Sequence, residues 1–571
     1  MPDRKLEQDK DFWTEQISEL SQRRAFAAGM GGAENVKRQH DAGRLTIRER
    51  IARLSDADSF REIGTLAGTG EYDDDLKLKK VIPATYVAGT ARIEGRPVAI
   101  GGEDFTVRGG ISFGAMRRKG GQGGYIEDLA HHYKMPLINL IDGAGGSVTS
   151  AKRRGFVVFP GVDGFERSVE LLGEVPVISA VLGTAAGGPA GRAILSHFSV
   201  MVEGTSQIFA AGPPVVKRSL GQTICKEDLG GPQVAVKKAG SIHNAVKSEE
   251  EAFLQIKRFL SFMPQNVWEL PPVLPVDDPV ERCEDALLGL VPEQRTKPYN
   301  MKKLISLVID CNSEFEIRPT FGRAVITMLA RLGGRPVGII ANNPMIYGGA
   351  MDADAARKQI HFMELCDTFH IPLVFLVDVP GFMVGLKAEQ EGTLREGMRV
   401  VYTAGQLKVP TLTLVIRKCY GMAGMATCNK NDIDLKLAWP SGEWGSLPVE
   451  GGVAAAFRRD IAAADDPRAR EKELEAELRA YASPFRTAEA LGVEEIIDPR
   501  ETRPVLCDYV ALAEQRLRIT LGPRARAGVA PRGGGYEYCQ GFCCQPGRNR
   551  LPDHAQLPGD GHKNGGGVFG S

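Results

Sequence analysis

The feature that most constrains this chain is an internal repeat. Two apolar runs, Pro136–Asp142 and Pro372–Asp378, each end in an aspartate and a turn, and they lie 236 residues apart. In each half a second apolar run follows and leads into a glycine turn, at Gly187 and at Gly421, 234 residues apart. Because the landmarks keep their order and a nearly constant spacing, the sequence predicts a duplicated unit.

The composition of the repeated runs predicts the fold class. Each run is continuously apolar and rich in β-branched residues, which indicates strands covered on both faces. Helical patterns such as Asp354–Phe369 lie between them, and this alternation favours parallel strands joined by right-handed crossovers. We expect an α/β protein with a helical N-terminal lead-in, tandem domains at residues 1–285 and 286–530, and a disordered tail at residues 531–571.

The glycine turns suggest the chemistry. Each turn follows a buried strand and offers backbone amides that no large side chain covers, and Pro189 after Gly188 favours the start of a helix. Two amides aimed at one oxygen form an oxyanion hole, and loss of one donor typically costs about 3 kcal/mol of transition-state stabilisation. The alternative is that the glycines only permit tight packing. Their recurrence in both halves favours the functional interpretation.

Several enzyme classes and partners are excluded by what the sequence lacks. It has no GxSxG elbow, no HExxH motif and no P-loop, and its ten cysteines form no CxxC pair, so we expect no metal in this chain. The 71 basic residues balance 71 acidic ones, which predicts neither nucleic-acid nor membrane binding. Acidic residues near the N-terminus argue against an export leader, so we expect a cytoplasmic protein.

Longer motifs resemble the β-type carboxyltransferase subunits of biotin-dependent acyl-CoA carboxylases, the family of the propionyl-CoA and methylcrotonyl-CoA carboxylase β subunits. The resemblance covers roughly residues 15–530 and rests on these segments: Lys37–Ile51, Gly183–Gly188, Met201–Phe209, Gly212–Lys217, Leu229–Gly231, Gly334–Pro344, Ile371–Phe382, Arg417–Ala423, Leu437–Pro440 and Ile496–Pro504.

The resemblance implies a fold, a reaction and partners. The fold is crotonase-like in two tandem copies, commonly assembled as a hexamer. The reaction moves a carboxyl group from carboxybiotin to the α-carbon of an acyl-CoA, through an enolate held by two backbone oxyanion holes. Biotin is carried by a partner chain, since this sequence has no biotinylation motif, and the biotin carboxylase is a further chain because no ATP-binding loop is present.

The resemblance also assigns residues to roles. It places Gly187 and Gly188 at the acyl-CoA thioester, and Met422 and Ala423 at biotin. Further donors or walls, and the residues beside biotin, are expected at Gly145, Gly146, Gly381, Phe382 and Gly421. In the family one protomer supplies the first-half site and another protomer the second-half site.

Departures from the family pattern leave the substrate open. Arg192 stands where short-chain members have an aromatic segment, so we expect it to pair with an anion on a larger or more polar acyl group, or else to face solvent or a subunit contact. The basic run Arg117–Lys119 is either a contact for CoA phosphates or a solvated surface. A decarboxylase subunit, a transcarboxylase subunit and a non-catalytic ring-forming relative stay open as alternatives.

Overall fold

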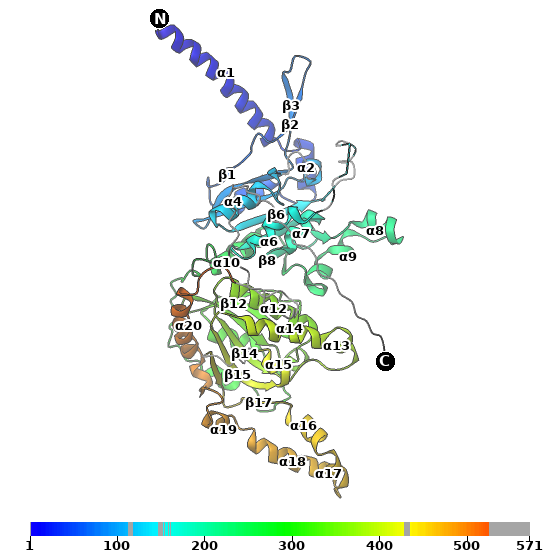
Figure 1. The fold of residues 1–571 in the computed structure, drawn as a ribbon, viewed down its shortest axis with the longest axis vertical. Helices are drawn as coiled ribbons and strands as arrows, with labels where there is room; N and C mark the ends of the chain where they lie inside the picture. Colours follow the sequence, from blue (N-terminus) through cyan, green and yellow to red (C-terminus); the bar gives the residue numbers. More distant parts are fainter. Residues whose placement is uncertain are drawn as a thin grey trace, which may run out of the picture. The chain divides into compact units, whose positions relative to one another are not determined.

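The repeat folds as two eight-stranded sheets that share one topology (Figure 1). The first sheet contains β1 (Arg61–Glu62), β4 (Tyr86–Ile93), β5 (Arg96–Glu103), β6 (Leu137–Gly143), β7 (Val177–Ala186), β8 (Phe198–Val202), β9 (Gln207–Phe209) and β10 (Asn244–Val246). The second contains β11 (Phe315–Glu316), β12 (Val325–Leu332), β13 (Arg335–Asn342), β14 (Leu373–Val379), β15 (Thr411–Tyr420), β16 (Leu435–Ala438), β17 (Glu443–Gly445) and β18 (Glu495–Ile496).

The order and direction of the strands match one for one. The first sheet runs β1-β4-β5-β6-β7-β8-β10 with β9 beside β7, and the second runs β11-β12-β13-β14-β15-β16-β18 with β17 beside β15. In each sheet the first two pairings are antiparallel and all the others are parallel. The predicted duplication and the α/β class are therefore confirmed. An additional hairpin, β2 (Gly68–Tyr72) with β3 (Leu78–Pro83), occurs in the first half.

Helices connect and cover the strands. A helical lead-in precedes the first sheet, as predicted. The helices are α1 (Pro2–Ala28), α2 (Ala33–Asp41), α3 (Ile47–Leu54), α4 (Tyr125–Tyr133), α6 (Glu166–Leu171), α7 (Gly188–Ile194), α8 (Pro213–Leu220), α9 (Lys226–Gly230), α10 (Glu249–Phe262), α11 (Met301–Val308), α12 (Ala353–Thr368), α13 (Leu386–Gln390), α14 (Thr393–Gln406), α15 (Gly421–Met425), α16 (Val449–Ala456), α17 (Arg458–Ala463), α18 (Pro467–Tyr481), α19 (Pro484–Glu489) and α20 (Thr502–Arg518). None of the described helices has the length and apolar composition needed to cross a membrane.

The hairpin turns show that one helix before each sheet belongs to the repeat. The amides of the Glu94–Gly95 turn between β4 and β5 donate to the carboxylate of Asp56, both at 2.8 Å. Those of the Gly333–Gly334 turn between β12 and β13 donate to Asp310, at 2.9 and 2.7 Å. Each aspartate lies two residues after a helix, Asp56 after α3 and Asp310 after α11. The two helices are therefore equivalent elements.

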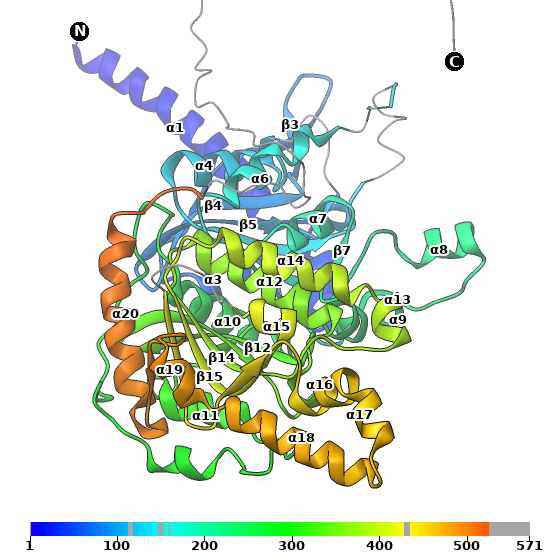
Figure 2. The same cartoon turned by 60° about the horizontal axis from the view of Figure 1, so that its bottom comes forward.

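Both faces of each sheet are covered, as the apolar runs predicted. Along β14, Phe375 and Val377 pack into a cluster with α12, whereas Val374 and Leu376 face a second cluster with α11 and α20. Figure 2 shows α12 and α14 side by side. The cluster around α12 also contains β6 side chains such as Leu140, so one apolar core extends from the first sheet to the second.

The computed structural model describes residues 2–111, 118–146, 152, 155–157, 159, 161–427 and 434–524, with the backbone alone for residues 2–11 and 163. The two sheets and the helices that cover them belong to one compact unit. Each sheet lies within one of the predicted domains. The boundary at residues 285 and 286 stays a prediction, and the expected disordered tail lies outside the described residues.

Candidate active site

The first glycine turn joins β7 to α7. Gly187 has φ 61° and ψ −126°, a conformation that side chains disfavour, and α7 begins at Gly188. The amide of Gly188 belongs to the first turn of the helix, where no intrahelical acceptor exists. Pro189 has no amide hydrogen, so it adds no donor beside Gly188.

The turn that follows β6 packs against the first glycine turn. A Cβ added at Gly187 would lie 3.6 Å from Cα of Gly145 and 3.9 Å from the amide nitrogen of Gly146. A Cβ added at Gly145 would lie 2.5 Å from the carbonyl oxygen of Ala186. The structure therefore brings together Gly145, Gly146, Gly187 and Gly188, the four first-half glycines that the sequence singled out.

Sequence reasoning missed Gln122 at this turn. Its side chain lies against Gly188, because a Cβ added there would be 2.0 Å from Oε1 and 3.3 Å from Nε2 of Gln122. The residue precedes α4 in a glycine-rich loop, where nothing in the local pattern indicated a polar contact. Because an amide group both donates and accepts hydrogen bonds, Gln122 adds a polar wall beside the turn.

Arg192 differs from one of the expectations. Its side chain is 2% exposed and forms an ion pair with Glu103, and Nη1 also donates to Oδ1 of Asn139 at 3.1 Å. Burial by itself would lower the pKa of Arg192, but the carboxylate of Glu103 raises it. The positive charge of Arg192 is therefore balanced inside the chain by Glu103, and its pairing with an anion on the acyl group stays a prediction. The guanidinium does not face solvent.

The basic run Arg117–Lys119 is less available to bind phosphate than the sequence suggested, because its described side chains form ion pairs within the chain. Arg117 lies outside the described residues. Arg118 is exposed and donates to Asp128 at 2.5 Å. Lys119 is nearly buried and bonds to Glu62 at 3.2 Å and to the carbonyl of Gly64 at 2.8 Å. Two of the three expected cations are thus engaged within the chain.

The second glycine turn joins β15 to α15 and opens on a cleft of about 1140 Å³. Gly421 has φ 61°, the value found at Gly187. Gly381, Phe382 and Met422 line the cleft, and the Met422 side chain is 41% exposed. Ala423 is fully buried beneath the turn. Four of the five predicted second-half residues therefore share one wall, whereas the Ala423 side chain faces the core.

Cys419 and Tyr420, the two residues just before this turn, have raised pKa values. Burial and then the carboxylate of Glu443 raise the pKa of Tyr420 to about 12, and Nη2 of Arg295 donates to its hydroxyl at 3.3 Å. Burial also raises the pKa of Cys419 to about 11. A thiol with that pKa is a poor nucleophile at neutral pH.

Strand register aligns the two turns residue by residue. Ile141 pairs with Val181 in the first sheet, and Val377 pairs with Val415 in the second. Counting forward from Val181 and Val415 makes Gly187 equivalent to Gly421. The residues that follow them, Gly188 and Met422, are then equivalent as well. Each amide next to a positive-φ glycine thus has a counterpart in the other half.

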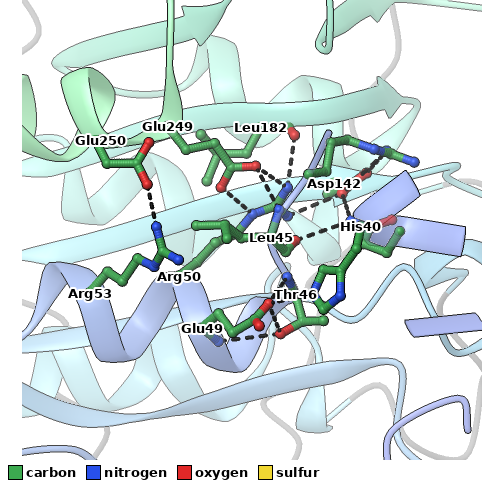
Figure 3. Close-up of polar contacts among 12 residues, drawn as sticks. His40, Leu45, Thr46, Glu49, Arg50, Arg53, Asp142, Leu182, Glu249 and Glu250 are labelled. Carbon is green, nitrogen blue, oxygen red and sulfur yellow. Dashed lines mark hydrogen bonds and ion pairs between the residues drawn. The ribbon is translucent and has the colours of Figure 1, made fainter. Parts of the chain in front are cut away.

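A buried aspartate precedes each site, and sequence reasoning gave neither one a role. Asp142, at the end of β6, is fully buried and accepts from Gln39 at 2.9 Å, Arg44 at 3.1 Å and Arg50 at 3.1 Å (Figure 3). These three donors come from the lead-in segment. The repeated polar residue at the end of an apolar run was the signal that could have indicated such a site.

Asp378, at the end of β14, is the counterpart in the second half. It is fully buried and bonds to Arg417 at 3.0 Å, and its own amide donates to Oδ1 of Asn342 at 3.1 Å. The Arg417 guanidinium also lies 5.0 Å from the ring centroid of Tyr299. Burial and the nearby carboxylate of Asp378 keep the pKa of Tyr299 well above its ordinary value.

The histidines near the first site have structural roles. Nδ1 of His197 accepts from the amide of Val177 at 3.0 Å, and its ring packs edge-on against Phe369. Nδ1 of His131 lies within hydrogen-bonding distance, 2.6 Å, of the Glu174 carboxylate. Among the described residues, no group of three or more His, Cys, Asp or Glu side chains is arranged to hold a metal ion.

Comparison with known proteins connects this geometry to one family. Residues 38–528 match the family described as "Carboxyl transferase domain". The carboxyltransferase subunit of propionyl-CoA carboxylase from Haloferax mediterranei is 35% identical over 86% of this chain and 94% of that protein. Methylmalonyl-CoA decarboxylase subunit alpha from Veillonella parvula is 32% identical over 87% and 96%.

A solved structure extends the likeness to three dimensions. Transcarboxylase 12S, described as a hexamer with methylmalonyl-CoA bound, aligns with a TM-score of 0.80 at 31% identity. The alignment covers 91% of this chain and 97% of that one.

Proposed function

Because the chain belongs to the carboxyl transferase family of biotin-dependent enzymes, we propose that it moves a carboxyl group from carboxybiotin to the α-carbon of an acyl-CoA. The observation that carries the proposal is the pair of equivalent glycine turns, one at the end of β7 and one at the end of β15. A carboxyl transfer joins two reactants, and each needs an oxygen held by backbone donors as charge develops on it.

The first-half turn is proposed as the acyl-CoA site. Removal of a proton from the α-carbon places negative charge on the thioester oxygen, and the amide of Gly188 is placed to receive it. The amide of Gly146 lies beside the same turn and is a candidate second donor. Gly187, with its positive φ, and Gly145, with its close approach to Ala186, let the two turns meet at this point.

The second-half turn is proposed as the biotin site. The cleft is large enough for a bicyclic ring system, and Phe382, Met422 and Trp444 give it an apolar wall. The amide of Met422, next to Gly421, is a donor for the ureido oxygen. Carboxybiotin, when bound, supplies the carboxyl group and the base that removes the α-proton. The chain itself binds and orients the reactants and polarises their oxygens.

The partners are proposed from the relatives. Transcarboxylase 12S forms a hexamer, and we propose the same assembly here, with the first-half site of one protomer completed by the second half of another. The carrier of biotin and the biotin carboxylase are separate chains. The match to a methylmalonyl-CoA decarboxylase subunit makes decarboxylation of a malonyl-type CoA the second candidate.

A reconstituted assay distinguishes these functions. The chain is combined with a carboxylated biotin carrier and offered acetyl-, propionyl- and longer acyl-CoA esters, and the carboxylated product is measured. The reverse assay offers methylmalonyl-CoA and uncarboxylated carrier. Forward transfer supports the carboxylase function, and transfer from methylmalonyl-CoA alone supports the decarboxylase. Failure in both directions with every ester contradicts the proposal and favours a non-catalytic ring subunit.

A further inference from the structure

Arg50 joins three chain segments beside the first-half turn (Figure 3). It lies on α3, and its side chain is 1% exposed. Nη1 donates to Asp142 on β6 at 3.1 Å, and Nη2 donates to the carbonyl oxygen of Leu182 on β7 at 2.8 Å. Nε and Nη2 also bind the carboxylate of Glu249 on α10, at 2.7 and 2.8 Å. One planar guanidinium thus bonds to two strands and a helix.

The two strands lose their regular pairing at the place where Arg50 binds. Ile141 pairs with Val181, and the register between β6 and β7 becomes irregular between Ile141 and Gly143. Asp142 lies in that interval. Arg50 bridges it, because it bonds to the Asp142 side chain and to the Leu182 backbone. The bridge lies three residues before Gly145 and five before Gly187.

The sequence leaves room for this bridge. A Cβ added at Gly183 would lie 2.1 Å from Oδ1 of Asp142, so a glycine is needed for the carboxylate to take its position. Arg44 binds the same carboxylate. Two arginines therefore face the two carboxylates of Asp142 and Glu249, and buried charges that are balanced and hydrogen-bonded form a stable arrangement whose disruption is costly.

The second half shows that the fold itself does not require an arginine on this helix. The position on α11 that corresponds to Arg50 is Leu304, which is fully buried in an apolar cluster. There Arg417, at the position equivalent to Gly183, bonds to Asp378 from β15 itself. The same irregular pairing occurs between Val377 and Val379. The arginine that binds the buried aspartate thus comes from the lead-in helix in the first half and from a strand of the sheet itself in the second half.

We propose that Arg50 is a positioning residue of the acyl-CoA site. It holds the ends of β6 and β7 at the spacing that lets the turns after both strands act on one oxygen. The inference rests on the proposed function of the first-half turn. It makes the lead-in helix α3 part of the acyl-CoA site, although no atom of that helix has to touch the substrate.

The test compares three variants of the full chain assembled with its carboxylated carrier. Arg50→Leu copies the residue that α11 has at the equivalent position. Arg50→Lys keeps the charge and removes the planar fork. Arg53→Leu is the matched control, because Arg53 lies on the same helix and forms a half-exposed ion pair with Glu250. The measurements are kcat, KM for propionyl-CoA, KM for the carrier, and calorimetric binding of propionyl-CoA to the purified chain.

Arg50→Lys is expected to lower kcat about 100-fold, since a displacement of roughly 1 Å at a reacting group has an effect of that size. It should weaken propionyl-CoA binding about 10-fold, the order expected for one lost hydrogen bond. KM for the carrier should not change. Arg50→Leu should have the larger effect, and Arg53→Leu should match the wild type.

Unchanged kcat and binding in Arg50→Lys would overturn the inference. Equal losses on the acyl-CoA and carrier sides would also overturn it, because they indicate general damage to the fold. If Arg50→Leu does not fold, the lysine variant decides. A wild-type chain that binds propionyl-CoA but transfers no carboxyl group refutes the proposed function alone, and the binding comparison still decides the role of Arg50.

Discussion

The two eight-stranded sheets share every strand pairing, and the two halves of the molecule differ in how they hold one buried aspartate. In the first half, Asp142 is bound by Arg44 and Arg50, which lie before the sheet begins. In the second half, Asp378 is bound by Arg417 of the neighbouring strand. A buried carboxylate needs a counter-charge, and a duplicated fold can supply it from different elements. The first half therefore depends on a segment that lies outside its sheet.

The surroundings of the two turns differ in charge as well. In the first sheet, Thr184 pairs with Gln207, and the equivalent pair in the second sheet is Lys418 with Glu443. Burial lowers the pKa of Lys418 even though Asp378 opposes this, and burial raises that of Glu443. The strand pair itself is thus uncharged in the first half and ionisable in the second, whereas in the first half Lys226 and Glu227 bond to the pair from α9.

The largest effect is expected from a side chain at the turn glycines. Gly187→Ala should lower kcat by about 100-fold to 1000-fold, because the positive φ would be strained and the donor beside it displaced. Any accompanying rise in KM should be confined to the acyl-CoA in Gly187→Ala and to the carrier in Gly421→Ala. Steady-state kinetics, with the acyl-CoA and the carrier varied in turn, measures both KM values in each variant.

Gly95→Ala is the control for backbone strain. Gly95 has φ 78° in the β4–β5 hairpin, and a Cβ there would meet no atom within 4 Å. The variant should lose some stability and keep wild-type kinetics. If Gly187→Ala and Gly421→Ala both affected the same substrate, the assignment of one turn to each reactant would be wrong.

The next effect tests the two buried pairs against each other. Arg417→Leu should destabilise the chain by about 3 kcal/mol, since the fully buried Asp378 then keeps only Lys418 as a counter-charge, with Nζ 3.7 Å away. Arg50→Leu should cost at least as much, because it leaves the buried carboxylate of Glu249 without its counter-charge even though Arg44 still faces Asp142. Denaturant unfolding of both variants measures the difference. A smaller loss in Arg50→Leu than in Arg417→Leu would show that Glu249 does not depend on Arg50 for its counter-charge.

A smaller effect is expected at Gly188, whose equivalent in the second half is the larger residue Met422. Gly188→Ala should lower kcat about 10-fold, because the new methyl group meets Gln122, whose flexible side chain can shift only in part. Adding Gln122→Ala should restore most of the activity. A double variant as impaired as Gly188→Ala would show that Gln122 is not the obstacle.

The smallest effect is expected from Met422→Gly, which makes the second turn resemble the first. The Met422 side chain is partly exposed in the cleft, and the exchange keeps the backbone amide. The value of kcat should change by less than about 3-fold, since the donor is retained. A large loss in the steady-state assay would mean that the Met422 side chain itself binds the second reactant.

The sequence by itself determined the architecture. Two continuous apolar runs, Pro136–Asp142 and Pro372–Asp378, predicted strands buried on both faces, and the constant spacing of the landmarks predicted that the unit occurs twice. These features are local or periodic, so they can be recognised without knowing which residues meet. The same holds for the glycines at Gly187 and Gly421, since a positive-φ turn between a strand and a helix is encoded at the turn itself.

Tertiary structure alone decided which charges meet. Arg50 and Asp142 are 92 residues apart in the chain, and Arg192 and Glu103 are 89 apart. From its neighbours Arg192 looked like a substrate contact, yet its partner lies on β5. Whether two charged side chains so far apart in the chain meet depends on how whole helices and strands pack. The local sequence pattern does not contain that information. For the same reason the sequence repeat alone did not indicate that Arg50 on α3 bonds to the strands that precede the first glycine turn.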